Sequence, residues 1–200
     1  MRSALDAAAL RLVKSQATDG TWPVDVANPV GSPTTYGVAL ASYMAWNSLN
    51  RSSLREIAAA RERASRWLVA ITPDSVPNAA VKLLFLETNR HGPTTPRVLY
   101  TSKAPPPSRP PGYAESLDFL RRVQAQDGGW GPYADSPSEV FDTAVALLAL
   151  SAFRDEEGVD EMVQRGREYL SATQLADGSW PATTRPTGGH SYAQEMSTTG

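Results

Sequence analysis

Apolar residues recur at helical spacing along much of the chain and predict an all-α protein. They fall three and four residues apart near the N-terminus and again beyond residue 113, at Leu5, Ala8, Ala9, Leu12 and Val13, then at Leu117, Leu120 and Val123. A helix with one apolar face and a polar remainder covers a core from outside. We therefore expect amphipathic outer helices in both places.

A second kind of helix is predicted where apolar residues are denser. Three such segments are Thr34–Leu49, Asn78–Leu86 and Ser138–Phe153. Within the last, residues 144–150 are apolar on every side, a pattern that predicts burial all round. Because the two kinds of helix alternate along the chain, we expect stacked hairpins with the apolar helix of each pair inside.

A motif with the pattern Gln-x-x-Asp-Gly-x-Trp occurs three times, each time after a predicted outer helix. Its fixed positions are Gln16, Asp19, Gly20 and Trp22, then Gln124, Asp127, Gly128 and Trp130, then Gln174, Asp177, Gly178 and Trp180. The long interval between the first two copies leaves room for a degenerate copy, which we place between Trp67 and Glu87. The Asp-Gly pair is expected to end each helix, because glycine accepts the left-handed conformation found just past a helix C-terminus.

These elements predict one repeat domain over residues 1–200, with about four outer and three inner helices. Its hairpins are expected at about 1–50, 51–92, 113–155 and 156–200. The last is incomplete, because its inner helix only begins near Glu195. Seven prolines between Pro93 and Gly112 exclude a helix there and predict an extended loop over 93–112.

Composition excludes several classes of protein. Nineteen Lys and Arg against 21 Asp and Glu leave a net charge of −2 and no basic block, so no nucleic-acid partner is expected. The absence of cysteine excludes disulfides and thiolate chemistry. The longest apolar run, seven residues, is too short to span a membrane, and Asp6 lies where an export signal would be apolar. We therefore expect a soluble, cytoplasmic protein.

The motif resembles the QW repeat of the terpene cyclase superfamily, which includes squalene-hopene cyclases and has protein prenyltransferase β subunits as relatives in fold. The chain is identified as a divergent or partial member. The resemblance implies a partial (α/α) toroid of helical hairpins. It also implies that Gln and Trp of each motif tie neighbouring outer helices together, which is a structural role. The residues agree, because a buried Trp needs a partner for its ring N–H.

The resemblance also implies an acid motif at the start of an inner helix. Class II cyclases protonate a double bond with the middle acid of Asp-x-Asp-Asp-Thr, and the matching residues here are Glu139-Val140-Phe141-Asp142-Thr143. Asp142 and Glu139 are therefore the candidate catalytic residues. Phe141 stands in the place of the proton donor, and phenylalanine has no proton to donate.

Both acids also have plain structural explanations. Ser136-Pro137-Ser138-Glu139 has the pattern of a capping box with proline at the first helical position. Asp142 lies three residues beyond Glu139, on the same face if both are helical. A salt bridge or an exposed position explains Asp142 as well as a place at a cavity mouth does.

The candidate substrate-binding residues are the aromatic side chains of the inner helices, because ring faces stabilise carbocations. They are Tyr36, Tyr43, Trp46 and Phe141. The same helical spacing also fits an ordinary core.

No metal or cofactor is expected. The acids of Glu156 to Asp160 are interrupted by Gly158 and fit a solvated loop better than a magnesium motif. His91 and His190, without cysteine, do not make the zinc site of a prenyltransferase. The chain also has neither the Gly-x-Ser-x-Gly elbow of a serine hydrolase nor a glycine-rich phosphate loop.

Two functions follow from these patterns. The first is a divergent terpene cyclase-like or prenyltransferase-like protein that binds or processes a long apolar isoprenoid, with lyase or isomerase chemistry if it is an enzyme. The alternative is a non-catalytic helical-repeat module that binds protein, or a fragment of a larger cyclase-like protein. Peripheral membrane contact, and a second copy or partner chain at the open edge of the stack, are compatible with both.

Overall fold

The computed structural model describes residues 4–24, 37–91 and 111–181, and within these ranges the regular secondary structure is entirely helical. The α-helices are α1 (Ala4–Ser15), α2 (Gly37–Leu49), α3 (Ala58–Ala70), α4 (Val76–His91), α5 (Tyr113–Val123), α6 (Val140–Leu150) and α7 (Val159–Thr173). A 3-10 turn, Arg55–Ile57, precedes α3. The predicted all-α class is confirmed.

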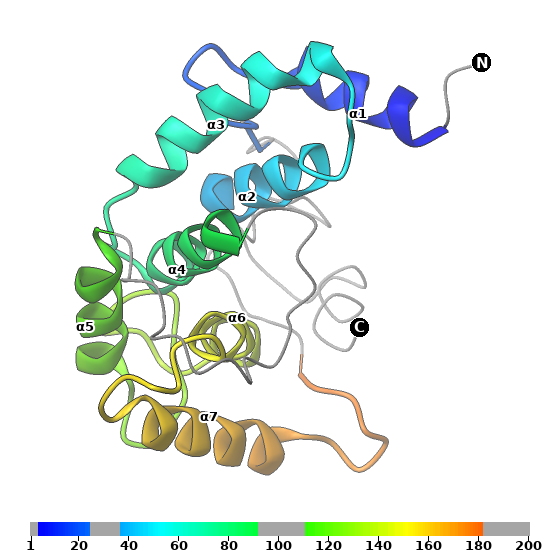
Figure 1. Ribbon diagram of the computed structural model, residues 1–200. Coiled ribbons are helices and arrows are strands. Elements are labelled where there is room, and N and C mark those ends of the chain that lie inside the picture. The colour runs from blue at the N-terminus through cyan, green and yellow to red at the C-terminus, as the bar shows by residue number, and fades with distance from the viewer. Residues whose placement is uncertain (1–3, 25–36, 92–110, 182–200) are drawn as a thin grey trace, which may run out of the picture.

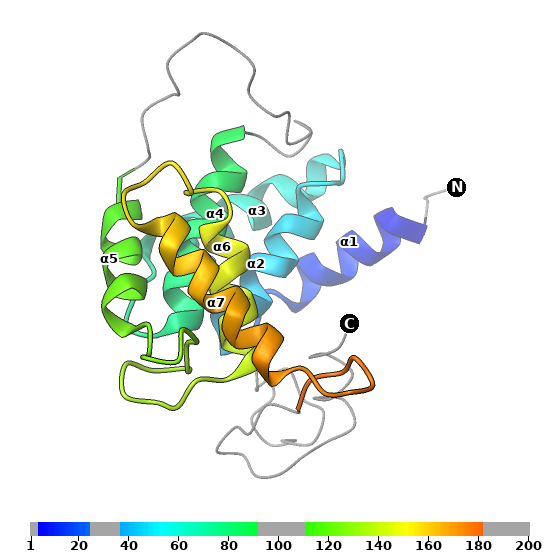
Figure 2. The same cartoon turned by 90° about the horizontal axis from the view of Figure 1, so that it is seen from below.

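The helices alternate between two layers of a crescent. The outer layer holds α1, α3, α5 and α7, and the inner layer holds α2, α4 and α6 (Figure 1). Seen from below, the inner helices lie between α5 on one side and α1 on the other (Figure 2). Because α4 packs against α2, α3, α5 and α6, it is the centre of the crescent. Among the described residues, four outer and three inner helices in this order form the partial toroid that the sequence predicts.

The core consists of two clusters of buried side chains that meet at α4. One face of α4 contributes Val76, Ala79, Ala80 and Leu83 to a cluster shared with α5, α6 and α7. Another face contributes Val81, Phe85 and Leu86 to a cluster shared with α1, α2 and α3. An inner helix that is buried on nearly every side therefore joins the two halves of the molecule.

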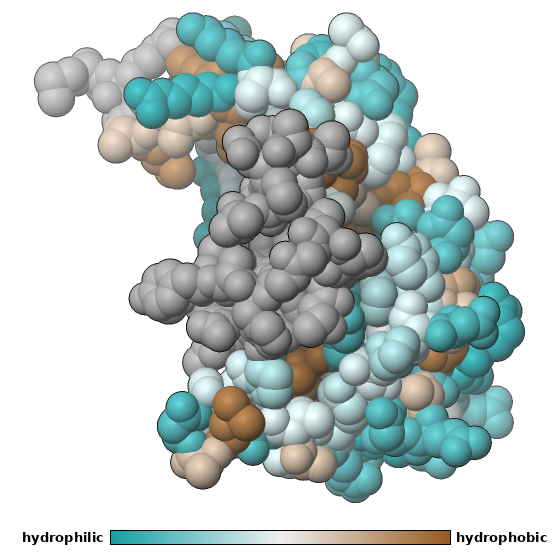
Figure 3. Space-filling view, turned by 180° about the vertical axis from the view of Figure 1, so that it is seen from behind, coloured by the Kyte–Doolittle hydropathy of each residue, from teal (hydrophilic) through white to brown (hydrophobic). Residues whose placement is uncertain are grey.

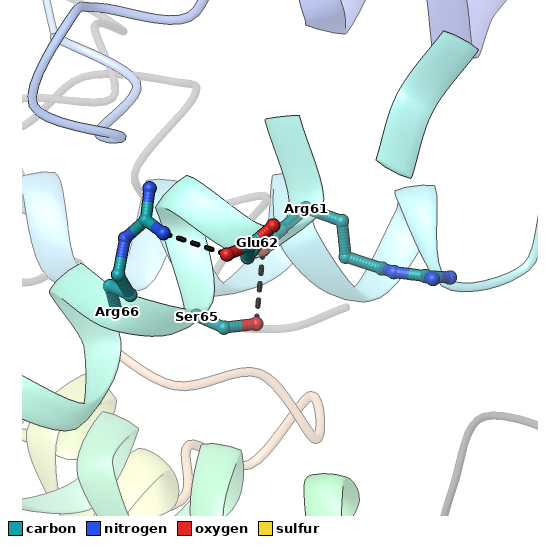
Figure 4. Close-up of polar contacts among 4 residues, drawn as sticks. All are labelled: Arg61, Glu62, Ser65 and Arg66. Carbon is teal, nitrogen blue, oxygen red and sulfur yellow. Dashed lines mark hydrogen bonds and ion pairs between the residues drawn. The ribbon is translucent and has the colours of Figure 1, made fainter. Parts of the chain in front are cut away.

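Polar contacts fix the outer layer to the inner one as well. The Trp46 ring N–H on α2 donates to Ser65 Oγ on α3 over 2.8 Å, and that hydroxyl donates to the Arg61 carbonyl one turn earlier. Figure 4 shows the bond from Ser65 to the Arg61 carbonyl within α3, with the surface pair Arg66–Glu62 beside it. Since Trp46 is almost fully buried, its ring N–H needs such a partner.

Two inner helices differ in length from the prediction. The second, α4, runs from Val76 to His91 instead of Asn78 to Leu86. It starts early because Pro77 lies in the first turn, where a missing N–H costs nothing. The third, α6, runs from Val140 to Leu150 instead of Ser138 to Phe153. Phe153 follows in a hydrogen-bonded turn that still buries its ring.

The expectation that α6 is buried all round is wrong. Leu148 is 59% exposed and Ala144, one turn before it, is exposed too. The neighbours of α6 are α4 and α7, which cover its other sides. Apolar composition alone therefore did not decide which side of the helix is covered.

Several predictions fall outside the described residues. They concern Tyr36, His190, the start of a helix near Glu195, and all but the last residues of the proline-rich loop. In the part of the chain that is described, no helix is long and apolar enough to cross a membrane.

Candidate functional site

The three motif turns share one local geometry. Each outer helix ends at the residue before the motif Gln, and Gln124 and Gln174 are already extended. Gly20, Gly128 and Gly178 have φ of 96°, 88° and 89°. The left-handed glycine was predicted, but its expected place as the helix cap is wrong. It lies well beyond the helix end and closes a separate turn, in which Gly128 N donates to the Ala125 carbonyl.

Side chains within each motif complete the turn. In all three copies the Trp ring N–H donates to a leucine carbonyl ten residues earlier, at Leu12, Leu120 and Leu170, over 2.8–2.9 Å. The Gln amide donates to the carbonyl of the motif glycine over 2.8–3.0 Å. The motif Asp accepts from the backbone N–H two residues later. All of these contacts lie within the hairpin's own outer helix and turn.

The first two turns also bind the next outer helix. Gln16 Nε2 donates to the Ala60 carbonyl of α3 over 2.8 Å, and Arg63 of the same helix donates back to Gln16 Oε1. In the second copy Gln124 Nε2 donates to the Met162 carbonyl of α7 over 2.9 Å. Arg165 of α7 donates to the Ala125 carbonyl over 2.8 Å and, over 3.4 Å, to Gln124 Oε1.

The same two turns reach the inner layer through the Trp backbone. Trp22 N donates to Ser42 Oγ of α2 over 3.0 Å, and Trp130 N donates to Thr143 Oγ1 of α6 over 2.9 Å. Ser42 and Thr143 are both fully buried. The threonine of the candidate acid motif therefore has a structural partner in this molecule.

Among the residues that the structure describes, the third turn makes the local bonds alone. Gln174 and Gly178 are exposed, and within the described chain Gln174 Nε2 donates only to the Gly178 carbonyl. A Cβ built on Gly178 would meet no described atom within 4 Å, whereas at Gly20 and Gly128 it would lie 2.6 and 2.5 Å from a carbonyl oxygen of the next outer helix.

The middle hairpin has neither Gln nor Trp at its turn, and Lys82 of α4 supplies the contact instead. Its buried Nζ donates to the Ile71 carbonyl at the end of α3 over 2.8 Å and lies 3.9 Å from Glu115 of α5. Lys82 is not among the residues predicted from the sequence. Its signal is a single cation in an otherwise apolar stretch of inner helix, a position that a lysine occupies only when its charge is paired or bonded.

The two candidate acids lie in different environments. Asp142 is fully buried in the first turn of α6, so the alternative of an exposed position is wrong. Glu139 precedes that helix with extended backbone (φ −126°, ψ 145°) and is half-buried. Because Glu139 is not helical, the expected three-residue spacing on one helix face does not apply to this pair.

The capping box expected at residues 136–139 is also wrong. The helix α6 is capped by Glu139, three residues after Ser136, and no side chain bonds to that cap. Ser138 Oγ donates to Asp127 Oδ1 of the motif turn over 2.7 Å. Tyr169 of α7 donates to the Ser138 carbonyl over 2.9 Å. Burial raises the pKa of Tyr169, and the negative charges of Asp127 and Glu139 raise it further. The negative charge of Glu139 therefore acts on Tyr169 of α7, together with the charge of Asp127 in the motif turn.

The candidate aromatic residues of α2 pack into the core. Trp46 lies edge-on to Phe85 at 4.8 Å between ring centres, and Tyr43 stacks beside Trp46 at 6.1 Å. The Tyr43 hydroxyl lies 3.1 Å from Thr88 Oγ1, and burial raises the pKa of Tyr43. Phe141 is half-buried against the cluster shared by α4, α5, α6 and α7. These rings have the neighbours that an ordinary core provides.

No group of three or more His, Cys, Asp or Glu side chains able to hold a metal ion occurs in the ranges that the structure describes.

Comparison with known proteins finds a family model and a relative that each match part of the chain. Residues 103–194 match the family model described as the squalene-hopene cyclase C-terminal domain. A squalene-hopene cyclase of Bradyrhizobium diazoefficiens is 40% identical over an 81-residue alignment, which covers 35% of this chain and 12% of that protein. The match thus spans only a small part of the length of the curated relative.

Proposed function

Because the chain is a partial, terpene cyclase-like member of the superfamily whose squalene-hopene cyclase C-terminal domain matches residues 103–194, we propose that it binds a long apolar isoprenoid along its inner helices. Binding without protonation is the specific function proposed. Phe141 stands where the resemblance puts a proton donor, and its side chain offers no acidic hydrogen.

The observation that carries this proposal is the complete burial of Asp142 inside the matched segment. A buried carboxylate in an otherwise apolar helix such as α6 is uncommon, and such groups are often found at functional sites. Its position, next to Phe141 at the start of an inner helix, favours a polar role at one end of an apolar ligand.

Apolar side chains on the inner layer support the same proposal. Met44 of α2 is 54% exposed and Leu148 of α6 is 59% exposed, although each lies on an inner helix. On the face seen from behind, hydrophobic side chains appear as separate brown patches within a largely hydrophilic surface (Figure 3). A hydrocarbon chain is bound mainly through apolar contacts and needs few polar groups.

The test is native mass spectrometry of the purified chain after incubation with squalene and, separately, with geranylgeranyl diphosphate. We expect the chain to retain squalene, and we expect extraction followed by gas chromatography and mass spectrometry to find no new product. Met44→Gln and Leu148→Gln should each weaken retention. Failure of the unaltered chain to retain either compound would show that the proposal is wrong.

The replacement at residue 141 has its own test. Phe141→Asp restores an acid at the donor position, and Asp142→Asn removes the buried carboxylate without changing its size. If the chain lacks only a donor, product appears with Phe141→Asp and is lost in the double variant. Product from the unaltered chain would contradict binding without protonation.

A second function, a repeat module that binds another protein, is favoured by a different observation. The third motif turn is formed but exposed, whereas its two counterparts are each covered by an outer helix.

A further inference from the structure

Each motif turn contains an Asp-Gly pair, a dipeptide in which the aspartate side chain can react with the next backbone nitrogen, because glycine has no Cβ to obstruct the approach. The three pairs begin at Asp19, Asp127 and Asp177. In each, the carboxylate accepts from the backbone N–H two residues later and from one hydroxyl. The glycine N–H donates to the carbonyl three residues earlier. The reacting groups are therefore bonded alike in all three turns.

The turns differ in what must separate before an aspartate can react. The first turn is bonded to α3 through Gln16, and the second to α7 through Gln124 and Arg165. The Trp backbone of each also bonds to an inner helix. The third turn has none of these contacts within the described residues, and it lies at the end of the crescent, beyond α7 (Figure 1). Local opening therefore breaks the fewest bonds at Asp177.

The turns also differ in the space around the glycine. Gly20 and Gly128 are buried, and a Cβ on either would lie 2.6 or 2.5 Å from a carbonyl oxygen of the next outer helix. Gly178 is exposed, and a Cβ there would meet no described atom within 4 Å. A ring that forms between the aspartate and the glycine needs this space, and so does the water that reopens it.

We propose that Asp177 is a modification site at which aspartate converts spontaneously to isoaspartate, while Asp19 and Asp127 are protected by the helices that cover them. The Gly178 nitrogen attacks Cγ of the protonated Asp177 carboxyl and forms a new C–N bond. The carboxyl OH leaves as water with the proton of that nitrogen, and a succinimide ring remains. The reaction needs no cofactor or oxidant.

Water then opens the succinimide at one of its two carbonyls by breaking the bond to nitrogen. Opening at Cγ restores aspartate, and opening at the former backbone carbonyl gives isoaspartate, whose main chain is longer by one methylene. The added methylene moves the Asp177 carboxylate away from the Ser179 N–H and lengthens the loop that Gln174 and Gly178 close. The exposed turn is thereby altered as the chain ages, and the reaction depends on neither proposed function.

The test incubates the folded chain in a mildly acid buffer. The Ser179 hydroxyl and backbone N–H lower the pKa of Asp177, and the protonated carboxyl is the form that loses water. Peptide mass spectrometry follows the succinimide, which is lighter by one water, and isoaspartate, which resists an Asp-specific protease. We expect isoaspartate to form at residue 177 about tenfold faster or more than at residues 19 and 127. In urea, where no turn is covered, the three sites should react at similar rates.

Two matched variants test the role of the covering helices. Arg165→Gln removes bonds from α7 to the second turn, and Arg63→Gln removes the bond from α3 to the first, without touching a bond inside either turn. Each should speed the reaction only at the aspartate of the turn it uncovers, residue 127 or residue 19.

Three outcomes would overturn the proposal. The first is an equal rate at the three sites of the folded chain. The second is the absence of isoaspartate at residue 177 under conditions in which the chain in urea forms it. The third is a preference for residue 177 that persists in urea, because the local sequence and not the cover would then decide the rate.

Discussion

The outer layer of the crescent is joined in two different ways. Where α1 meets α3 and α5 meets α7, a motif glutamine links a turn to the next helix. Between α3 and α5, Lys82 of the inner helix α4 donates to the Ile71 carbonyl at the end of α3, and its ammonium lies 3.9 Å from Glu115 of α5. We refer to these as the motif joints and the lysine joint.

The difference follows from what each side chain can donate and accept. A glutamine amide does both, so it can bond a carbonyl and an arginine together. A lysine ammonium only donates, so its second partner must be an acceptor. Glu115 stands at the same distance before Gln124 as Arg165 does before Gln174. At the second motif joint the outer helix α7 carries a cation, Arg165, which donates to the turn. At the lysine joint the cation is Lys82 itself, and the outer helix α5 carries an anion, Glu115.

The largest expected effect separates the covered turn from the exposed one. Gly128→Ala places a Cβ 2.5 Å from the Arg165 carbonyl oxygen in a residue with φ of 88°. Strain and overlap together should cost about 2–5 kcal/mol of the free energy of unfolding. Gly178→Ala has the same φ strain without the overlap and should cost about 1–2 kcal/mol. Urea unfolding of both variants measures the difference, and equal losses would contradict the covered joint.

The next effect tests the lysine joint. Lys82→Met keeps the apolar stem but leaves the Ile71 carbonyl without its donor. It should cost about 1–3 kcal/mol in urea unfolding.

Glu115→Gln is the control for that joint. The Glu115 side chain is 69% exposed and lies 3.9 Å from Lys82 Nζ. Loss of its charge should therefore cost at most about 0.5 kcal/mol. If Glu115→Gln costs as much as Lys82→Met, the ion pair and not the carbonyl bond holds the joint.

A smaller effect compares two identical substitutions. Gln124→Ala removes bonds to the Gly128 and Met162 carbonyls. Its expected cost is about 1–2 kcal/mol. Gln174→Ala removes one exposed bond that water replaces. Its expected cost is about 0.5 kcal/mol or less. Unfolding curves of the two variants, measured with heat and with urea, check this ordering. A larger loss of stability for Gln174→Ala than for Gln124→Ala would contradict it.

The smallest effect is on acid stability and concerns the motif aspartates. The Thr21 backbone N–H lowers the pKa of Asp19, and the Ser179 hydroxyl and backbone N–H lower the pKa of Asp177. A folded-state pKa below the unfolded one adds stability that is complete above the unfolded value, about 3.9, and is lost as pH falls through the folded value.

Carboxyl ¹³C NMR titration should place both groups below the ordinary aspartate pKa. Asp19→Asn should make unfolding less steeply pH-dependent below pH about 4, because it removes a group that binds its proton more readily in the unfolded state. Titration at the ordinary value would mean that the turn does not bond its carboxylate in solution.

Much of the fold could be predicted because it is repeated. Three copies of one motif and two alternating kinds of helix establish the order of outer and inner elements. The lysine joint could not be predicted in the same way, because Lys82 is a single residue with no counterpart. The capping box was wrong because α6 begins only at Val140, so Glu139 is itself the cap residue and Ser136 lies three residues before it.

The candidate site was predicted only in part. The acid motif located Asp142, but its composition does not distinguish an exposed carboxylate from a buried one. Burial came from α4 and α7 packing on α6, which are contacts between segments distant in sequence. The aromatic spacing on α2 indicated a shared face, and packing with Phe85 then placed that face in the core.

The sequence by itself determined the helices, their order and the shape of each motif turn, because every bond inside a turn joins residues ten or fewer positions apart. Only the tertiary structure decided which turns are covered. The carbonyls that Gln16 and Gln124 reach lie 44 and 38 residues away, so those bonds exist only once the next hairpin has packed. The exposed turn at Gln174 has the same motif and local bonds, and differs because no such helix covers it within the described chain.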